Sequence, residues 1–469
     1  MTATDSEPAA DGPSDERTDE VATTAAVGRH PTVKGGLALW ALFLGFAMLM
    51  VGNGVNLAVI GVRIVEEGFG VGTGGVVMAS YFAGFLLGPV VVVRMLSGVG
   101  HIRVFASLAS LASCAVLVQF VWVSPVSWAS MRFVSGFCMV GLYVVVESWL
   151  NDASTSSNRG RTLAVYMIVS MGSLALGQLL IAAADPSGGV LFVVSSILVS
   201  LSFLPMALAA TTQAPPVRVA DRLGVRDLAR IAPTGVVGML FTGASHGIVY
   251  GLAAIYATRS GFDPGRTAVF VAAPSIGALL LLWPVGWASD RLPRRGVIFV
   301  VAAGGAATSA LLAVVPSGSA AVVPLMVLLG GCTFPLYSLL LSYTIDWSPP
   351  GTAMAASGTL LRINGTGAVI GPIVAGILIG VFGEVSMFWC LVATHATIAA
   401  YVAYRLVVAD GLPLDRQGAF VPMPARASDF ALRLTSRPLE ASRSRLRPAT
   451  SFRDRSDDAA SSVTPGRRR

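Results

Sequence analysis

Long apolar runs, separated by short polar turns, dominate the chain between Leu37 and Ala409. Each run is close to the roughly 20 residues that a helix needs to cross the bilayer core. Backbone N–H and C=O groups at that depth find no water to bond, so the runs must be helices. The pattern predicts twelve membrane-spanning helices, at residues 37–60, 72–93, 104–123, 126–150, 163–183, 190–209, 233–257, 267–288, 297–315, 320–345, 354–381 and 385–408.

The composition agrees with a polytopic membrane protein of the all-α class. Hydrophobic residues make up 54% of the 469 residues and charged residues only 12%, and the mean hydropathy is +0.73. A chain this apolar cannot close a single soluble core. The histidines are scattered, and the spacing of the cysteines suits neither a metal site nor a disulfide framework. We therefore expect no metal, no cofactor and no enzymatic activity. The cysteines, all inside apolar runs, are Cys114, Cys138, Cys332 and Cys390.

Basic residues in the short connections fall mainly on one side of the predicted bundle. Arg and Lys in short loops mark the cytoplasmic side, so an even number of spans places both termini in the cytoplasm. Residues 1–36 are acidic and are predicted to form a disordered cytoplasmic tail. They lack a short apolar segment, which favours the first helix itself as the insertion signal.

The second tail, residues 410–469, alternates Arg with Ser, Asp and Pro, and it carries most of the net charge of +7. We predict that it is disordered and cytoplasmic. Two interpretations stay open: a solvated segment, or a segment that contacts anionic lipid headgroups. Its Arg residues are dispersed among acids and follow a membrane domain, so nucleic-acid binding is not favoured.

A polar stretch at residues 211–232, interpreted as a cytoplasmic central loop, divides the chain into two halves of six helices, 37–210 and 233–409. The halves echo each other. Glu147 closes the fourth helix much as Asp346 closes the tenth, at a period near 200 residues. A repeat of a six-helix unit is the expected trace of a transporter built from two rocking halves.

The turn between the eighth and ninth helices begins at Gly286 and places Asp290 directly before Arg291, with Arg294 and Arg295 following. A carboxylate beside basic residues suggests an ion-paired latch rather than a simple lipid anchor. The turn resembles the signature cytoplasmic loop of the major facilitator superfamily, and the resemblance covers the chain from the first to the twelfth predicted helix. It implies a twelve-helix transporter whose cytoplasmic gate is latched by these five residues.

Other segments resemble a bacterial branch of that superfamily, the YcaD-like transporters. They are Gly100-His101-Ile102-Arg103, Glu147-Ser148-Trp149-Leu150-Asn151 and Arg159-Gly160-Arg161. The branch implies a bacterial inner membrane and brings no substrate with it. The first-half loop departs from the superfamily pattern, because it carries Arg94 and Arg103 but no carboxylate. We therefore expect Glu147 to pair with Arg94 or Arg103, and Asp346 to pair with the Arg residues of the second loop.

Ionisable groups at membrane depth are functional candidates by default. Arg132 lies in the fourth helix on one broad stripe with Tyr143, and with Gly136 it partly resembles a family motif whose Arg is linked to proton movement. A structural Arg is the alternative. His246 lies near the middle of the seventh predicted helix and is of a residue type that titrates near neutral pH, so it is a candidate for proton coupling or for a structural hydrogen bond. The remaining candidates for the substrate pathway are Asn53, Asn56, Gln178 and Arg362.

No Asp or Glu occupies the middle third of a predicted helix, which favours neutral or anionic solutes over cations. The leading hypothesis is a secondary transporter that moves a small organic solute by alternating access, with direction and proton coupling open. A monomer in the bilayer is sufficient for this mechanism. The alternatives are a drug/proton antiporter that exports lipophilic compounds and a non-transporting membrane sensor. Without a phosphate-binding Gly-rich loop, ATP-driven transport is not expected.

Overall fold

The computed structural model describes residues 32–154, 158–209 and 223–423, and this part of the chain is built from helices. Twelve of the described segments are long and apolar enough to cross a membrane, as the apolar pattern predicts. The first half contains α1 (Thr32–Glu66), α2 (Val71–Val99), α3 (His101–Val121), α4 (Pro125–Ala153), α5 (Arg159–Leu179), a 3₁₀ turn (Leu180–Ala183), α6 (Val190–Leu201) and α7 (Phe203–Ala209). The second half contains α8 (Val225–Ile231), α9 (Pro233–Arg259), α10 (Pro264–Arg291), α11 (Arg294–Val314), α12 (Val322–Thr333), α13 (Pro335–Trp347), α14 (Ala353–Phe382), α15 (Ser386–Val408) and a 3₁₀ turn (Leu414–Arg416).

Two predicted spans are each divided into two helices. The sixth span, expected over 190–209, consists of α6 and α7, and the tenth, expected over 320–345, consists of α12 and α13. Pro205 and Pro335 lie just after the breaks. Proline has no N–H for the carbonyl four residues earlier, and its ring clashes with that carbonyl. Hydropathy alone does not register such a break, so the sequence pattern predicted continuous helices.

Two long helices begin at a side-chain cap followed by proline. Ser124 accepts a hydrogen bond from the Ser127 amide at 3.2 Å ahead of α4. Asp263 accepts one from the Arg266 amide at 3.0 Å ahead of α10. The proline that follows each cap fits the first helical position because its missing N–H would have no partner there. These residues fix where the two helices enter the bundle.

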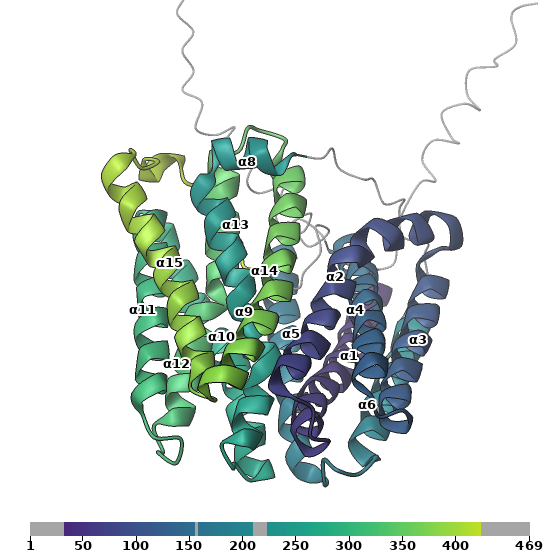
Figure 1. The fold of residues 1–469 in the computed structure, drawn as a ribbon. Coiled ribbons are helices and arrows are strands. Elements are labelled where there is room, and N and C mark those ends of the chain that lie inside the picture. Colours follow the sequence, from purple (N-terminus) through teal and green to yellow (C-terminus); the bar gives the residue numbers. More distant parts are fainter. Residues whose placement is uncertain (1–31, 155–157, 210–222, 424–469) are drawn as a thin grey trace, which may run out of the picture.

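The helices form two bundles that lie side by side, α1–α6 in one and α9–α15 in the other (Figure 1). We call the end that carries the α2–α3, α4–α5 and α10–α11 connections and α8 the basic face. The end that carries the α1–α2, α9–α10 and α14–α15 connections is the opposite face. A Cβ on Gly75 of α2 would lie 2.4 Å from the Pro372 carbonyl oxygen of α14, and one on Gly61 of α1 would lie 2.6 Å from the Ala254 Cβ of α9. Close backbone contact between the bundles is therefore concentrated toward the opposite face.

Arg residues on the opposite face bind partners across loops. Arg63 at the end of α1 pairs with Glu67 and donates to the Ser187 carbonyl before α6. Arg259 Nη2 lies 2.8 Å from Glu384 Oε1 in the α14–α15 connection. The pKa of the Glu384 carboxyl is lowered from its usual value, first by a hydrogen bond from its own backbone amide and then by Arg259, against an opposing effect of burial. These contacts tie loop to helix within each half.

Three boundaries differ from the sequence-based expectation. The first helix begins at Thr32, inside the tail expected at 1–36, and α8 lies inside the central loop expected at 211–232. The prediction of disorder from residue 410 onward is wrong for 410–423: this segment packs against the second half, with Val421 and Met423 buried. Its apolar residues and bound backbone groups supply the stabilisation that a purely polar tail lacks. The rest of both predicted tails lies outside the described residues.

Candidate functional site

A buried polar cluster occupies the first half around Arg132, the eighth residue of α4. Its side chain is fully buried, and Nη1 donates to Asn56 Oδ1 of α1 at 2.9 Å. Asn56 in turn donates to Gln119 Oε1 of α3 at 2.9 Å. The Arg132 guanidinium also lies 4.6 Å from the centre of the Tyr81 ring of α2, a cation–π arrangement. Residues of four helices therefore form one buried cluster, in which two candidates singled out from the sequence, Arg132 and Asn56, are in direct contact.

The other candidates of the first half are buried at separate points. Tyr143, on α4, lies with its hydroxyl 3.0 Å from the Met50 sulfur of α1. Gln178, near the end of α5, accepts a hydrogen bond from Ser275 of α10 at 3.1 Å and so links the two halves. Asn53 is 6% exposed on α1, one turn before the Asn56 of the cluster. The structure thus supports a set of polar positions along α1, α4 and α5 rather than one compact site.

In the second half, His246 of α9 and His395 of α15 approach the same residue, Thr333. His246 Nε2 lies 3.4 Å from the Thr333 carbonyl oxygen, and its ring stacks on Phe334 with centroids 4.9 Å apart. His395 Nε2 lies 3.1 Å from the Thr333 hydroxyl, and its Nδ1 lies 2.8 Å from the Leu391 carbonyl oxygen. Thr333 is the last residue of α12, so the two rings meet the break in the tenth span.

Arg362 lies apart from these clusters. Its side chain on α14 is exposed, whereas Asn364, two residues later, is buried and donates to the Met239 carbonyl oxygen at 3.3 Å. The structure does not bring Arg362 to Arg132 or to His246 through any described contact. Its place in the substrate pathway stays a prediction.

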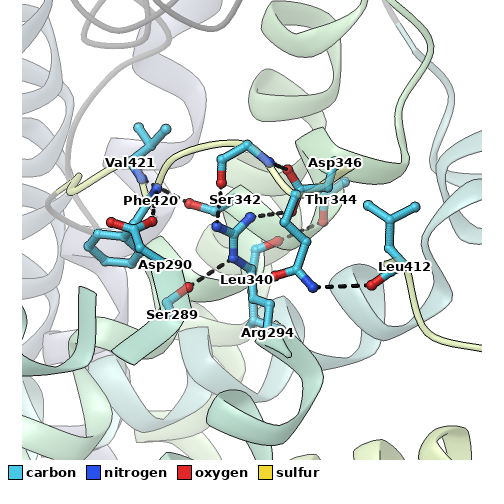
Figure 2. Close-up of polar contacts among 12 residues, drawn as sticks. Ser289, Asp290, Arg294, Leu340, Ser342, Thr344, Asp346, Leu412, Phe420 and Val421 are labelled. Atoms are coloured by element: carbon cyan, nitrogen blue, oxygen red, sulfur yellow. Dashed lines mark hydrogen bonds and ion pairs between the residues drawn. The ribbon is translucent and has the colours of Figure 1, made fainter. Parts of the chain in front are cut away.

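The α10–α11 turn binds a wider set of partners than the sequence predicted. Arg294 forms a buried ion pair with Asp346 of α13 and also donates to Ser289 at 2.9 Å (Figure 2). This is the contact expected for Asp346, while its part in a gate stays a prediction. Arg291 is exposed and lies 4.4 Å from the centre of the Trp287 ring.

The remaining residues of this turn bind the chain that follows α15. Arg295 donates to the carbonyl oxygens of Ala409 and Asp410 at 2.8 and 3.0 Å. Asp290 accepts a hydrogen bond from the Phe420 amide at 2.7 Å, and Gly286 lies under the Phe420 ring, where a Cβ would come within 2.7 Å of Cδ1. The latch residues therefore hold the start of the C-terminal tail, a role that the sequence analysis did not foresee.

The expected pairing of Glu147 with the first-half loop is not formed. Glu147 is fully buried on α4 and accepts a hydrogen bond from the Tyr166 hydroxyl at 2.6 Å. Arg94 and Arg103 are exposed, and within the described residues neither forms an ion pair with it. The partner described for this carboxylate is therefore a residue of α5. A gate role for these three residues stays a prediction.

Several residues at these clusters were not singled out from the sequence. Gln119, Tyr81, Thr333 and His395 carry no motif, and only the rotation of each helix shows that they face the candidates. Phe420 and its neighbours did leave a signal, the apolar run Ala419 to Met423 inside an otherwise charged tail.

The fold and these clusters define a polytopic helical membrane protein with two six-helix halves and polar residues inside each. Residues 42–342 and 235–439 match the family model of the Major Facilitator Superfamily. The chain belongs to this superfamily, whose members are transporters rather than enzymes, and it is an MFS-type transporter.

The chain is similar to the uncharacterized MFS-type transporter YcaD of Salmonella typhi, with 28% identity over 345 residues that cover 71% of this chain and 86% of the relative. YcaD of Salmonella paratyphi B shares 28% identity over 326 residues, covering 67% and 81%. Among solved structures, the nucleoside transporter NupG matches with a TM-score of 0.67 at 13% identity, covering 80% of this chain and all of that one. A bacterial homologue of the human lysosomal transporter Spinster, inward-facing and occupied, matches with a TM-score of 0.65 at 14% identity, covering 84% and 100%. These structures share the fold.

Proposed function

We propose that the protein is a secondary active transporter that moves a small neutral or anionic organic solute by alternating access between its two halves. The solute contacts the polar clusters of both halves, and the protein works as a monomer in a bacterial inner membrane with the basic face in the cytoplasm. The observation that carries this proposal is Arg132, a fully buried cation at membrane depth.

Burying a guanidinium in the membrane is expensive, so such a residue is retained for a purpose. The described partners of Arg132 include the Asn56 amide and the Tyr81 ring, and no Asp or Glu lies in the middle third of a predicted helix. The ion pair Arg294–Asp346 lies instead at the basic face. A solute that reaches the first-half cluster thus meets a positive field, which favours an anionic or hydrogen-bonding group over a cation.

The test is a solute screen on the purified protein. We expect one or more organic anions, sugars or amino acids to raise the melting temperature, since a solute at 100 times its Kd stabilises the folded state by about 2.7 kcal/mol. Arg132→Ala should abolish the shift. Arg259→Ala is the matched control, because it removes an Arg from an exposed pair on the opposite face and should retain the shift.

Each alternative has its own outcome in the screen. A shift confined to lipophilic cations, and transport of those cations after both Glu147 and Asp346 are neutralised, would contradict the preference for neutral or anionic solutes and support the drug antiporter. A protein that responds to no solute class and moves none in proteoliposomes would support the sensor.

Proton coupling is the second element of the proposal, and it rests on His246. Replacing His246 with Ala should flatten the dependence of the transport rate on pH between about 5 and 8, the range in which histidine changes charge. His395→Ala is the control: this side chain is fully buried with both ring nitrogens near oxygen atoms, so its loss should lower the melting temperature and leave the pH profile unchanged. Initial transport rates in proteoliposomes measure the pH profiles of both variants, and thermal unfolding of the purified protein measures the melting temperature. A wild-type profile for His246→Ala would make His246 structural.

A further inference from the structure

The segment 418–423, which we call the tail strap, is bound to the second half mainly through its backbone. The Gly418 amide donates to Asp346 Oδ1 at 2.9 Å, and the Gly418 carbonyl accepts from Arg294 Nη2 at 2.7 Å. The Phe420 amide donates to Asp290 Oδ1 at 2.7 Å. The strap therefore binds the carboxylates of Asp290 and Asp346 (Figure 2).

One face of α13 continues this binding site deeper into the bundle. Ser342 accepts a hydrogen bond from the Val421 amide at 3.1 Å. Ser338 accepts one from the Met423 amide at 2.9 Å and donates to the Met423 carbonyl at 2.8 Å. Ser338, Ser342 and Asp346 are four residues apart and so share one side of the helix. This polar stripe runs the length of the strap, and all three side chains are bound to it.

Burial adds to these hydrogen bonds. Val421 is 3% and Met423 1% exposed, and both belong to the apolar core of the second half. The Phe420 ring lies on Gly286 of α10. The strap is thus inserted between α10 and α13, with its ends held by polar groups and its middle by apolar contact.

A second partner for Asp290 would come from α5 when the basic face closes. Helices α5 and α10 are antiparallel neighbours that meet through Gln178 and Ser275. At the basic face their ends are the last turn of α10, with Asp290, and the first turn of α5, with Arg161 exposed. A helix N-terminus has unbonded N–H groups and a partial positive charge, which attract a carboxylate. Closing the basic face by alternating access would bring the start of α5 toward Asp290. The Oδ1 atom of Asp290 already accepts a hydrogen bond from the Phe420 amide.

We infer that the tail strap is an autoinhibitory element: it holds the basic face open by occupying Asp290 and the space between α10 and α13, and it must leave before that face closes. The inference rests on the alternating access of the proposed function. It assigns the C-terminal tail a regulatory role and makes release of the strap a step in the transport cycle.

The test measures the separation of the two halves at the basic face without any solute. Spin labels are attached at Gly160→Cys and Leu292→Cys, both exposed positions, in full-length protein whose native cysteines are replaced by alanine. Val421→Asp places a charge at the buried strap position and should release it. Ala419→Asp, two residues away and exposed, is the matched control.

We expect Val421→Asp to raise the ratio of short to long label distances about tenfold, the factor that corresponds to losing one charge-assisted hydrogen bond. Phe420→Pro removes the donor to Asp290 without burying a charge, and it decides the question should Val421→Asp fail to fold. Ala419→Asp should give the wild-type distribution. Unchanged distances in the released variants, or equal changes in the control, would overturn the inference. Because no solute is present, this result is independent of the solute screen, so failure of the strap and failure of the proposed function are distinguishable.

Discussion

Replacing Arg294 with methionine should lower the free energy of unfolding by about 3–5 kcal/mol, the effect of removing one partner of a buried ion pair. The Arg294 side chain is 2% exposed and that of Asp346 5% exposed, so the remaining carboxylate would be left in a poorly solvated site. The same change also removes the hydrogen bonds to Ser289 and Gly418. The melting temperature of the purified protein in detergent measures the loss.

Two further variants identify the cause. Arg291→Met removes an exposed Arg that lies over Trp287, and we expect a change of about 0.5–1 kcal/mol at most. Combining Arg294→Met with Asp346→Leu replaces both charges and should recover part of the stability lost in the single variant. Two results would contradict the role given to the buried charge pair. One is an equal loss of stability in Arg291→Met and Arg294→Met; the other is a double variant that loses more stability than the two single changes, Arg294→Met and Asp346→Leu, lose together.

Replacing Gly75 with valine should shift the conformational equilibrium away from contact at the opposite face. A Cβ there would lie 2.4 Å from the Pro372 carbonyl oxygen and 3.3 Å from the Gly376 Cα, both backbone atoms of α14 in the other half. Overpacking of this kind costs about 1–3 kcal/mol, and the two bundles can relieve it by moving apart. A shift of this size changes the ratio of the two conformations roughly tenfold. Labels at Gly70→Cys and Val385→Cys, exposed on the opposite face, should move apart.

Gly84→Val is the matched control on the same helix. A Cβ at Gly84 would lie 1.9 Å from the Phe133 carbonyl oxygen of α4, but α2 and α4 belong to one half. The clash cannot be relieved by separating the halves, so we expect a lower melting temperature and an unchanged label distance in the protein that folds. The prediction for Gly75 fails if both variants leave the distance at its wild-type value.

The twelve spans could be predicted from the sequence because hydropathy and length depend on consecutive residues alone. The contact between Arg294 and Asp346 was also predictable, since Arg294 begins one helix and Asp346 lies near the end of another at the same face. The Arg132 cluster was predictable only in part. The position of Arg132 marks it as buried, whereas its contacts with Tyr81 and Asn56 depend on how each helix is rotated about its axis. No periodicity in one helix fixes the rotation of another.

The ordered start of the C-terminal tail was missed for a different reason. Charge and proline dominate the composition of 410–469, and they outweigh the short apolar run at its beginning. Two buried side chains and six bound backbone groups suffice to order 418–423 once a matching surface exists on α10 and α13. The surface is formed by residues at least 72 positions away along the chain.

The hydrogen bonds that hold residues 418–423 go to peptide groups, which every amino acid except proline supplies in full. The surface on α10 and α13 therefore constrains the residue type strongly only where side chains are buried, at Val421 and Met423. The tails of related chains could differ at most residues and still bind this surface. Their common trait would be two apolar residues separated by one position, at a fixed distance from the last helix, rather than a motif that sequence alignment detects.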